Sequence, residues 1–221
     1  MLNRKEIEEL YRLLSEKITP KAELEYDSVF HLLVAVVLSA QATDKSVNLA
    51  TRAFFPERRT PQDFLDWGVE NLERATKSIG LYRNKSKAII ALCHKLISDF
   101  NGEVPSDLES LLTLPGVGVK TAKVVMNVGF GKPVVAVDTH IFRVANRTGL
   151  ATADTPERVG EILEKKTPKR YLRDAHHYLL LHGRYTCTAR NPHCDSCVIA
   201  PYCKYKARTA NQAKDTRKTY D

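Results

Sequence analysis

A lysine that directly follows a glycine-rich turn is the residue of this chain best suited to covalent chemistry. In the stretch LPGVGVKTA, residues 114–122, Lys120 falls in the first turn of an expected helix. The positive end of the helix dipole disfavours a charged amine there. A neutral lysine amine is a nucleophile toward carbon electrophiles and can form a Schiff base. The alternative is a lysine that stays charged and contacts a phosphate group.

The turn before Lys120 is suited to holding a phosphate. A short helix, LPGVG and a second helix from about Val119 form the pattern of a helix-hairpin-helix. Gly116 and Gly118 permit backbone conformations closed to other residues, so successive N–H groups can point at one phosphate. Such a contact would position a nucleic-acid backbone without reading its sequence. On this motif alone, a tight packing turn is an equal alternative.

Asp138 is the expected partner of Lys120. The helix from Lys120 to about Gly129 rises roughly 15 Å, and the extended run PVVAV returns over a comparable distance. Asp138 would thus arrive near Lys120, at the N-cap of a helix that contains THIFRVANR. If the turn holds a nucleic-acid backbone, a sugar C1′ is the electrophile, and a carboxylate can accept a proton and stabilise positive charge on that sugar. Capping alone is the alternative for Asp138.

Four of the five cysteines are clustered near the C-terminal end, with the spacing C-x6-C-x2-C-x5-C: Cys187, Cys194, Cys197 and Cys203. Such a cluster indicates a metal site, and ligation by sulfur alone suits either zinc or an iron–sulfur cluster. Structural zinc sites usually use two close pairs of cysteines, whereas only one is present here. The uneven spacing therefore favours an iron–sulfur cluster held by one continuous loop.

The cysteine loop also carries two candidate phosphate contacts, Arg190 and His193, for which plain solvent exposure is the alternative. The fifth cysteine, Cys93, lies on the apolar face of an expected helix and is assigned to the core.

Helical patterns recur along the chain and alternating strand patterns are almost absent, so the fold class is all-α. Thr60-Pro61 and Thr155-Pro156 are typical helix starts, and Ser106 begins a capping-box sequence, SDLE. The apolar run at 29–38 is too short to span a membrane and predicts a buried helix. A further helix is expected at 84–101, ending before Gly102, with one apolar face: Ala88, Ile89, Leu92, Cys93, Leu96 and Ile97.

Composition favours a nucleic-acid partner. The chain has 221 residues, of which 43% are hydrophobic, and a formal net charge of +8. This charge favours a polyanion, nucleic acid first and a membrane surface second. The N-terminus has no apolar signal segment, so we expect a soluble cytoplasmic protein. The last 18 residues are basic and poor in large apolar groups, which predicts a frayed tail.

Taken together, these motifs resemble the endonuclease III family of base-excision repair DNA glycosylases, the iron–sulfur type within the helix-hairpin-helix glycosylase superfamily. The resemblance extends from about Leu24 to Cys203 and includes LSAQATD, IGLYRNK, NGEVP, LPGVGVKTA, VAVDTHIFRVANR, LHGRYTC and the cysteine loop. Two positions depart from the family's commoner pattern: Val119 replaces an arginine, and Asn191 replaces a residue that is often basic.

The resemblance implies a two-lobed all-α fold with DNA bound in the cleft between the lobes. One domain would be a six-helix domain at residues 22–132. The other would join residues 1–21 to 133–221 and hold a [4Fe-4S] cluster. By motif match, Lys120 corresponds to the Schiff-base nucleophile, Asp138 to the catalytic aspartate and the four cysteines to the cluster ligands.

The resemblance also assigns Gln41 and Leu81 to the space that a flipped-out base leaves behind, because protein wedges partly replace lost stacking. Ordinary core packing is the alternative for Leu81. Ser39, Asp44 and His140 are candidate residues of the lesion pocket. Their alternatives are capping for Ser39 and Asp44, and hydrogen bonding on the helix surface for His140.

The function implied is that of a bifunctional enzyme, a DNA glycosylase for oxidised pyrimidines and an abasic-site lyase that works by β-elimination. Its partner would be double-stranded DNA with damaged pyrimidines or abasic sites, and it would act as a monomer in a prokaryotic cytoplasm, without a membrane. One rival is the monofunctional adenine mismatch glycosylase, which lacks a lysine at position 120. The other is a non-catalytic DNA-binding module, which gives no reason to bring Lys120 and Asp138 together.

Overall fold

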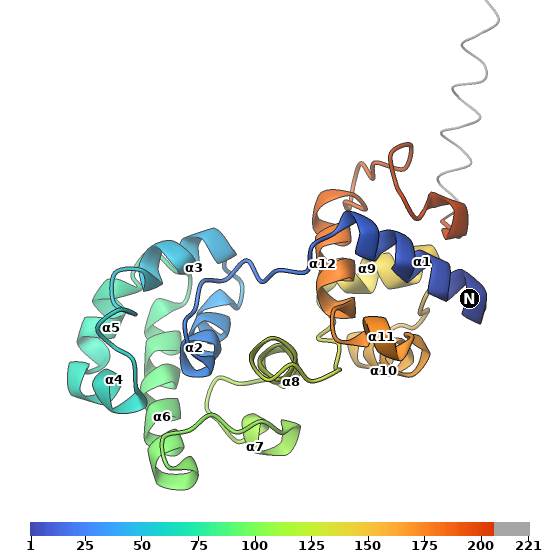
Figure 1. Cartoon of the computed structure of the whole chain (residues 1–221). Coiled ribbons are helices and arrows are strands. Elements are labelled where there is room, and N and C mark those ends of the chain that lie inside the picture. The colour runs from blue at the N-terminus through green and yellow to red at the C-terminus, as the bar shows by residue number, and fades with distance from the viewer. Residues whose placement is uncertain (206–221) are drawn as a thin grey trace, which may run out of the picture. The chain divides into compact units, whose positions relative to one another are not determined.

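The computed structural model describes residues 1–205, and within them every regular element is a helix, with no strand (Figure 1). The all-α prediction is confirmed. Most of the expected basic tail lies outside the described residues. No helix of the described part combines the length and the apolar character needed to cross a bilayer.

The chain divides into two compact units, which we call the hairpin unit, Ala22–Lys132, and the cysteine-loop unit, Met1–Lys21 with the chain from Pro133 onward. Their assignment as the two expected domains stays a prediction. The hairpin unit contains α2 (Val29–Ser39), α3 (Asp44–Thr51), α4 (Pro61–Trp67), α5 (Val69–Ala75), α6 (Tyr82–Phe100), α7 (Leu108–Leu112), α8 (Val119–Val124) and the π-helix η1 (Val125–Gly129). Gly68, with a φ of 81°, separates α4 from α5, so this unit has more helical segments than the six expected.

Helix α2 is the central helix of the hairpin unit. Its residues from Phe30 to Leu38 are all buried, because almost every side chain is apolar and other helices surround it. It packs against α3, α6 and α8, and Figure 1 shows α2 (blue) beside α6 (green). The prediction of a buried helix at this position is confirmed.

Most of the expected helix ends are observed. Thr60 and Thr155 cap α4 and α10, each with a proline at the first helical position. The start expected at Ser106 is wrong by one residue, because the carboxylate of Asp107 accepts the hydrogen bond from Ser110 N, at 2.8 Å, and caps α7.

Helix α6 begins at Tyr82 and ends at Phe100, and Gly102 N closes the end by donating to Leu96 O at 2.8 Å. Four residues of its expected apolar face are buried, whereas Ala88 is half-buried and Ile97 is 37% exposed. Cys93 is fully buried, as expected, and burial raises the pKa of its thiol to about 12.

The cysteine-loop unit contains α1 (Arg4–Lys17), α9 (Thr139–Thr148), α10 (Pro156–Lys166), α11 (Lys169–Leu172), α12 (Ala175–Tyr185) and the 3-10 helix η2 (Ala200–Tyr202). Helix α1 packs against α12. Its buried Tyr11 hydroxyl lies 2.9 Å from the Thr167 hydroxyl, and Leu2 N donates to Gly149 O at the end of α9. The N-terminal helix is therefore part of the same core as the C-terminal segment.

Helices α9 and α12 approach each other closely at Gly183. A Cβ atom at Gly183 would lie 2.9 Å from His140 Cβ and 3.0 Å from the His140 carbonyl oxygen. These distances leave no room for a methyl group, since one contact is to backbone. Gly183 therefore fixes how near α12 comes to the helix that Asp138 begins.

Candidate active site and cysteine loop

The glycine-rich turn is packed against α2 and α6. Val117 N donates to Leu114 O at 3.1 Å, and both side chains are buried. Gly116 has a φ of 78°, and a Cβ there would lie 3.1 Å from Ala88 Cβ and 3.5 Å from Val37 Cγ1. Gly116 is therefore required both for its backbone conformation and for close packing.

The expectation that Gly118 also needs a special conformation is wrong. Its φ is −96° with extended backbone at the N-cap of α8, which other residues adopt readily. A Cβ atom at Gly118 would have no neighbour within 4 Å. The residue is exposed, and the backbone does not require glycine there.

Lys120 is the second residue of α8, and its side chain is exposed. The residue lies in the first turn of α8, at the positive end of the helix dipole. After Val124 the helix continues as the π-helix η1, a form often found at functional sites. The end of η1 is fixed by Lys132 N donating to Met126 O at 2.9 Å.

Asp138 caps α9, as expected. Its Oδ1 accepts a hydrogen bond from Ile141 N at 2.8 Å, and the residue is half-buried. Capping uses Oδ1, so the second carboxylate oxygen remains for other chemistry. Lys120 belongs to the hairpin unit and Asp138 to the cysteine-loop unit, and their approach stays a prediction.

Both expected wedge residues have left-handed backbone. Gln41 has a φ of 55° and Leu81 a φ of 59°, and residues other than glycine rarely adopt such values. Gln41 is exposed and Leu81 is 61% exposed, so core packing, the alternative for Leu81, is wrong. Strained backbone of this kind persists only where the surrounding structure holds it, often at ligand contacts.

The three expected pocket residues have mixed local roles. The Ser39 hydroxyl donates to Val36 O at 2.9 Å within α2. Asp44 is the first residue of α3, and Thr43 rather than Asp44 is its N-cap. His140 Nδ1 lies 3.2 Å from Arg143 Nη2, as its helix-surface alternative predicted. A place in a lesion pocket stays a prediction for all three.

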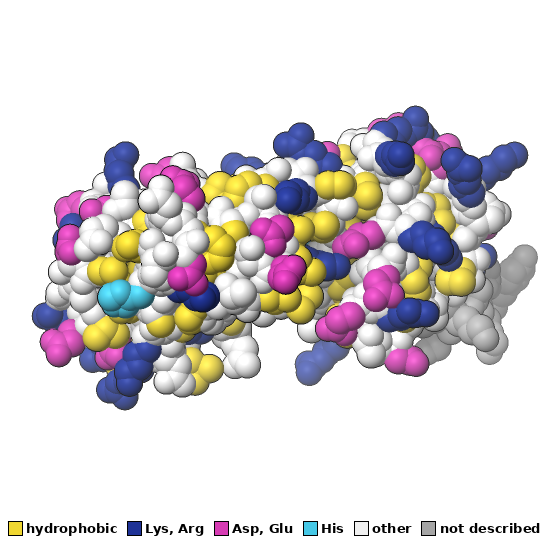
Figure 2. All heavy atoms as spheres, turned by 90° about the horizontal axis from the view of Figure 1, so that it is seen from below, with side chains coloured by type: hydrophobic (Ala, Val, Ile, Leu, Met, Phe, Trp, Pro, Cys, Tyr) yellow, Lys and Arg dark blue, Asp and Glu magenta, His cyan; other side chains and the backbone are white. Residues whose placement is uncertain are grey.

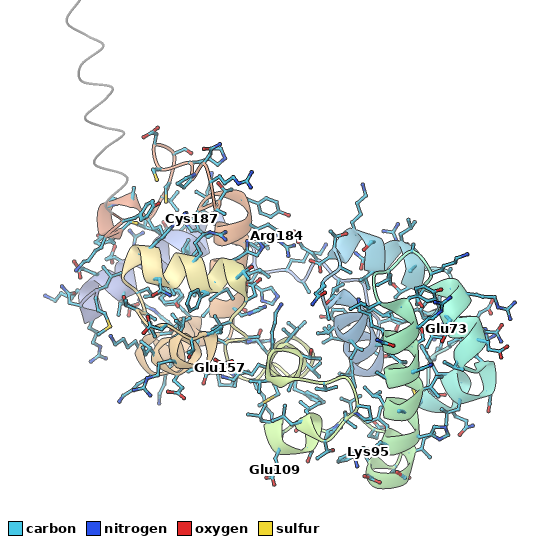
Figure 3. All side chains as sticks on the ribbon, turned by 180° about the vertical axis from the view of Figure 1, so that it is seen from behind. Glu73, Lys95, Glu109, Glu157, Arg184 and Cys187 are labelled. Carbon is cyan, nitrogen blue, oxygen red and sulfur yellow. The ribbon has the colours of Figure 1, made fainter. Side chains whose placement is uncertain are left out.

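All four clustered cysteines are half-buried and lie in the segment that follows α12, with η2 between Cys197 and Cys203. Figure 3 shows Cys187 beyond the end of α12, close to α9. Burial first, and the nearby thiols of the other three cysteines second, raise the pKa of Cys197 to about 11. In the described residues no three ligand-type side chains converge closely enough to hold an ion as they stand. The all-sulfur donor set nevertheless fits an iron–sulfur cluster, once the thiols lose their protons.

Two arginines of α9 hold the backbone of the cysteine loop. Arg143 Nε donates to Cys187 O at 2.9 Å, and its Nη2 donates to Gly183 O at 2.7 Å. Arg147 donates to the carbonyl oxygens of Thr188 and Ala189, each at 2.7 Å. Neither arginine was among the residues expected from the sequence. Their four-residue spacing in RVANR, which puts both on one helix face, is the signal that could have identified them.

The same loop leaves the two expected phosphate contacts at the surface. Arg190 and His193 are both exposed, and His193 N donates to Thr186 O at 2.9 Å. Exposure is compatible with a phosphate contact and with the alternative of mere solvation, so their role stays a prediction.

Comparison with known proteins defines the class of this chain. Residues 34–169 match the family model of the HhH-GPD superfamily, a base excision DNA repair family, and residues 187–203 match the iron–sulfur binding domain of endonuclease III. The chain therefore belongs to the helix-hairpin-helix superfamily of base excision DNA repair proteins. Endonuclease III of Haemophilus influenzae is 52% identical to it, over 92% of this chain and 97% of that protein. Endonuclease III of Escherichia coli is 51% identical, with the same coverage.

Solved structures of endonuclease III bound to DNA are also similar to this chain. A trapped covalent endonuclease III–DNA intermediate and a non-covalent endonuclease III–DNA complex each superpose with a TM-score of 0.88 at 42% identity. They cover 96% and 95% of this chain and all of the compared chains. Within its superfamily, the chain is a member of the endonuclease III family. It is a base-excision DNA glycosylase with abasic-site lyase activity, and its cofactor is a [4Fe-4S] cluster, with Cys187, Cys194, Cys197 and Cys203 proposed as its ligands.

Proposed function

We propose that this protein removes oxidised pyrimidines from double-stranded DNA and then cleaves the strand, with Lys120 as the nucleophile and Asp138 as the catalytic carboxylate. The observation that carries the proposal is the exposed amine of Lys120 at the start of α8. It directly follows a turn in which Gly116 is required. An exposed amine at this point could reach a sugar in a DNA backbone held by the turn.

The chemistry follows from these two side chains. Lys120 Nζ attacks the sugar C1′, and the bond from C1′ to the base breaks, with the electron pair and a proton going to the base. The C1′–O4′ bond then opens, with its electron pair and a proton going to O4′, and a Schiff base forms between Nζ and C1′. Loss of a C2′ proton expels the 3′ phosphate by β-elimination. Asp138 would accept the proton released from the ammonium group and stabilise positive charge on the sugar.

Residues around the nucleophile would bind the DNA. The backbone N–H groups at Gly116 and Gly118 would contact a phosphate, and Arg190 and His193 would contact others. Gln41 and Leu81 would occupy the gap left by the flipped base, while Ser39, Asp44 and His140 would line its pocket. Basic side chains, interspersed with acidic ones, lie over the face shown in Figure 2. The net charge of +8 supports association with a polyanion.

A panel of defined duplexes tests the proposal. Duplexes that carry one thymine glycol, one preformed abasic site or one adenine–guanine mismatch are incubated with the holoprotein, and the cleaved strands are separated by size. We expect cleavage 3′ to the thymine glycol and to the abasic site, and an intact mismatch duplex. Intact thymine glycol DNA after long incubation would contradict the proposal and favour a DNA-binding module.

The same holoprotein allows the expected monomeric state to be tested. Light scattering on a sizing column, with and without duplex DNA, should give the mass of one chain and then of one chain with one duplex. We place its action on chromosomal DNA in a prokaryotic cytoplasm, in keeping with its bacterial relatives.

A further inference from the structure

We propose that Lys85, a residue of α6, positions the two wedge residues Gln41 and Leu81 relative to each other. This inference rests on the proposed function, because it concerns how the enzyme opens the duplex. Lys85 would touch neither the DNA nor the reacting atoms. It would act through the backbone of the two turns that carry the wedges.

Lys85 joins α6 to the end of α2. The residue is 7% exposed, and its Nζ donates to the Leu38 carbonyl oxygen at 2.9 Å. Buried lysines are uncommon and need a partner. Burial lowers the pKa of Lys85, and the carbonyl end of α2 provides partial negative charge for the ammonium group. The lysine therefore replaces a missing N–H donor at this helix end.

The helix end that Lys85 contacts is the one that carries Gln41. Leu38 lies three residues before Gln41. A continuing helix would bond Ala42 N to Leu38 O, but Ala42 N instead donates to Ser39 O at 3.0 Å, which closes the turn around Gln41. Lys85 thus contacts the backbone at the base of that turn.

The same residue contacts the second wedge through its main chain. Lys85 N donates to Leu81 O at 3.1 Å, the first hydrogen bond of α6. Leu81 and Gln41 both have positive φ values, which surrounding contacts must maintain. Lys85 is bonded on one side to Leu81 and on the other to the helix end before Gln41. It therefore fixes the spacing between the two turns.

The glycine-rich turn packs at the same junction. The Cβ position of Gly116 faces Ala88, one turn after Lys85, and Val37, which precedes Leu38. Figures 1 and 3 both show α2 beside α6, and the two helices are in contact. The turns of Gln41, Leu81 and Gly116 therefore all adjoin the contact between α2 and α6. The hydrogen bond from Lys85 Nζ to Leu38 O crosses that contact.

Substitution of Lys85 tests this inference. Lys85→Met keeps most of the length of the side chain but removes the donor. Single-turnover excision is measured with thymine glycol in a fully paired duplex and with thymine glycol in a single-stranded gap, where no base pair must open. We expect excision from the paired duplex to fall about tenfold, which corresponds to roughly 1.4 kcal/mol in the barrier. Excision in the gap should fall less than about threefold.

Insertion of the wedge is measured separately. A fluorescent base analogue is placed opposite an uncleavable abasic-site analogue. The increase in its fluorescence on protein binding should be smaller for Lys85→Met than for the wild-type protein. Lys85→Arg, which restores a charged donor, should recover part of the signal. Lys87→Met, an exposed lysine of the same helix, is the matched control and should resemble the unchanged protein.

If Lys85→Met lowers the excision rate equally on paired and gapped DNA, or gives the same fluorescence increase as the wild-type protein, the positioning role of Lys85 is overturned. If Lys85→Met does not fold, Lys85→Gln is tested on the same two substrates. The ratio of its excision rates on fully paired and gapped DNA then decides the outcome. If the unchanged protein excises no base from either substrate, the proposed function fails instead, so the two failures are distinct.

Discussion

At the residue scale, a structural and a chemical role coexist at Asp138. One carboxylate oxygen caps α9 by accepting a hydrogen bond from Ile141 N at 2.8 Å. Capping requires only an oxygen acceptor, whereas the proposed chemistry requires a charged carboxylate that can accept a proton. Asparagine caps a helix about as well as aspartate does. The two roles can therefore be separated by a single substitution.

Asp138→Asn should retain most of the stability and lose most of the activity. The unfolding free energy should change by less than about 1 kcal/mol, since the amide oxygen can still accept the Ile141 hydrogen bond. Base release should fall on the order of 10² to 10⁴-fold, because the amide cannot accept a proton. Asp107→Asn, which alters the matching cap of α7, is the control. Equal activity of the two variants would contradict the role of Asp138.

Val119 offers a prediction about affinity rather than chemistry. It is 42% exposed at the first position of α8, directly before Lys120. Val119→Arg adds one charge where the DNA backbone is expected, so the logarithm of affinity should fall more steeply with the logarithm of salt, by about 0.9 in slope. Anisotropy titrations of an uncleavable duplex measure it, with Val119→Gln as the neutral control. An unchanged slope would show that no phosphate lies near this position.

At the element scale, the packing of α12 on α9 depends on Gly183. A methyl group would lie 2.9 Å from His140 Cβ and 3.0 Å from a backbone oxygen. Overpacking of this kind costs about 1 to 3 kcal/mol. It would also displace the helix face from which Arg143 and Arg147 hold the cysteine loop.

Gly183→Ala should therefore lower the urea midpoint of unfolding and reduce the iron bound by the purified protein. Gly80→Ala is the control, since a Cβ there would have no neighbour within 4 Å. Circular dichroism follows the unfolding, and iron analysis follows the cluster. A Gly183→Ala protein as stable as the Gly80→Ala protein would contradict the close approach of the two helices.

Local signals in the sequence are enough to predict the positions of most helices. The paired threonine and proline at the starts of α4 and α10 act within one turn, and the apolar run of α2 requires burial wherever it packs. By contrast, the sequence does not distinguish Ser106 from Asp107 as the cap of α7, because both offer an oxygen acceptor, and the structure uses Asp107. The special role of Gly118 was also wrong, since only Gly116 of the two has positive φ.

Long-range contacts were less accessible from the sequence. Lys85 bonds to a carbonyl 47 residues away, and Arg143 to one 44 residues away. The sequence shows these residues as ordinary charges on helices, and nothing local reveals which carbonyl they reach. Residues of the chemistry itself were easier to identify, because Lys120 and the cysteines lie in short motifs with fixed spacing.

At the scale of the whole molecule, the cysteine loop and the N-terminal helix belong to one compact unit, although they lie far apart along the chain. The [4Fe-4S] cluster would therefore tie the loop to a core that includes α1, α9 and α12. Metal ligation of this kind adds to folding free energy.

Cys197→Ala should accordingly lose the visible absorbance of the cluster and most of the bound iron, and should lower the thermal midpoint. Cys93→Ala, which removes the buried thiol of α6, should keep the iron. Iron and zinc are measured together on protein purified without oxygen. A colourless unchanged protein with zinc and no iron would contradict the cluster.

The central claim is that Lys120 forms the covalent bond to DNA, and borohydride trapping tests it most directly. Unchanged protein, Lys120→Ala and Lys95→Ala, which removes a lysine paired with Asp99 on α6, are each mixed with abasic-site duplex and borohydride. The resulting adducts are then resolved by size and mapped by mass spectrometry. We predict a strong adduct at Lys120 for the unchanged and Lys95→Ala proteins, and none for Lys120→Ala. Equal trapping by Lys120→Ala would contradict the claim.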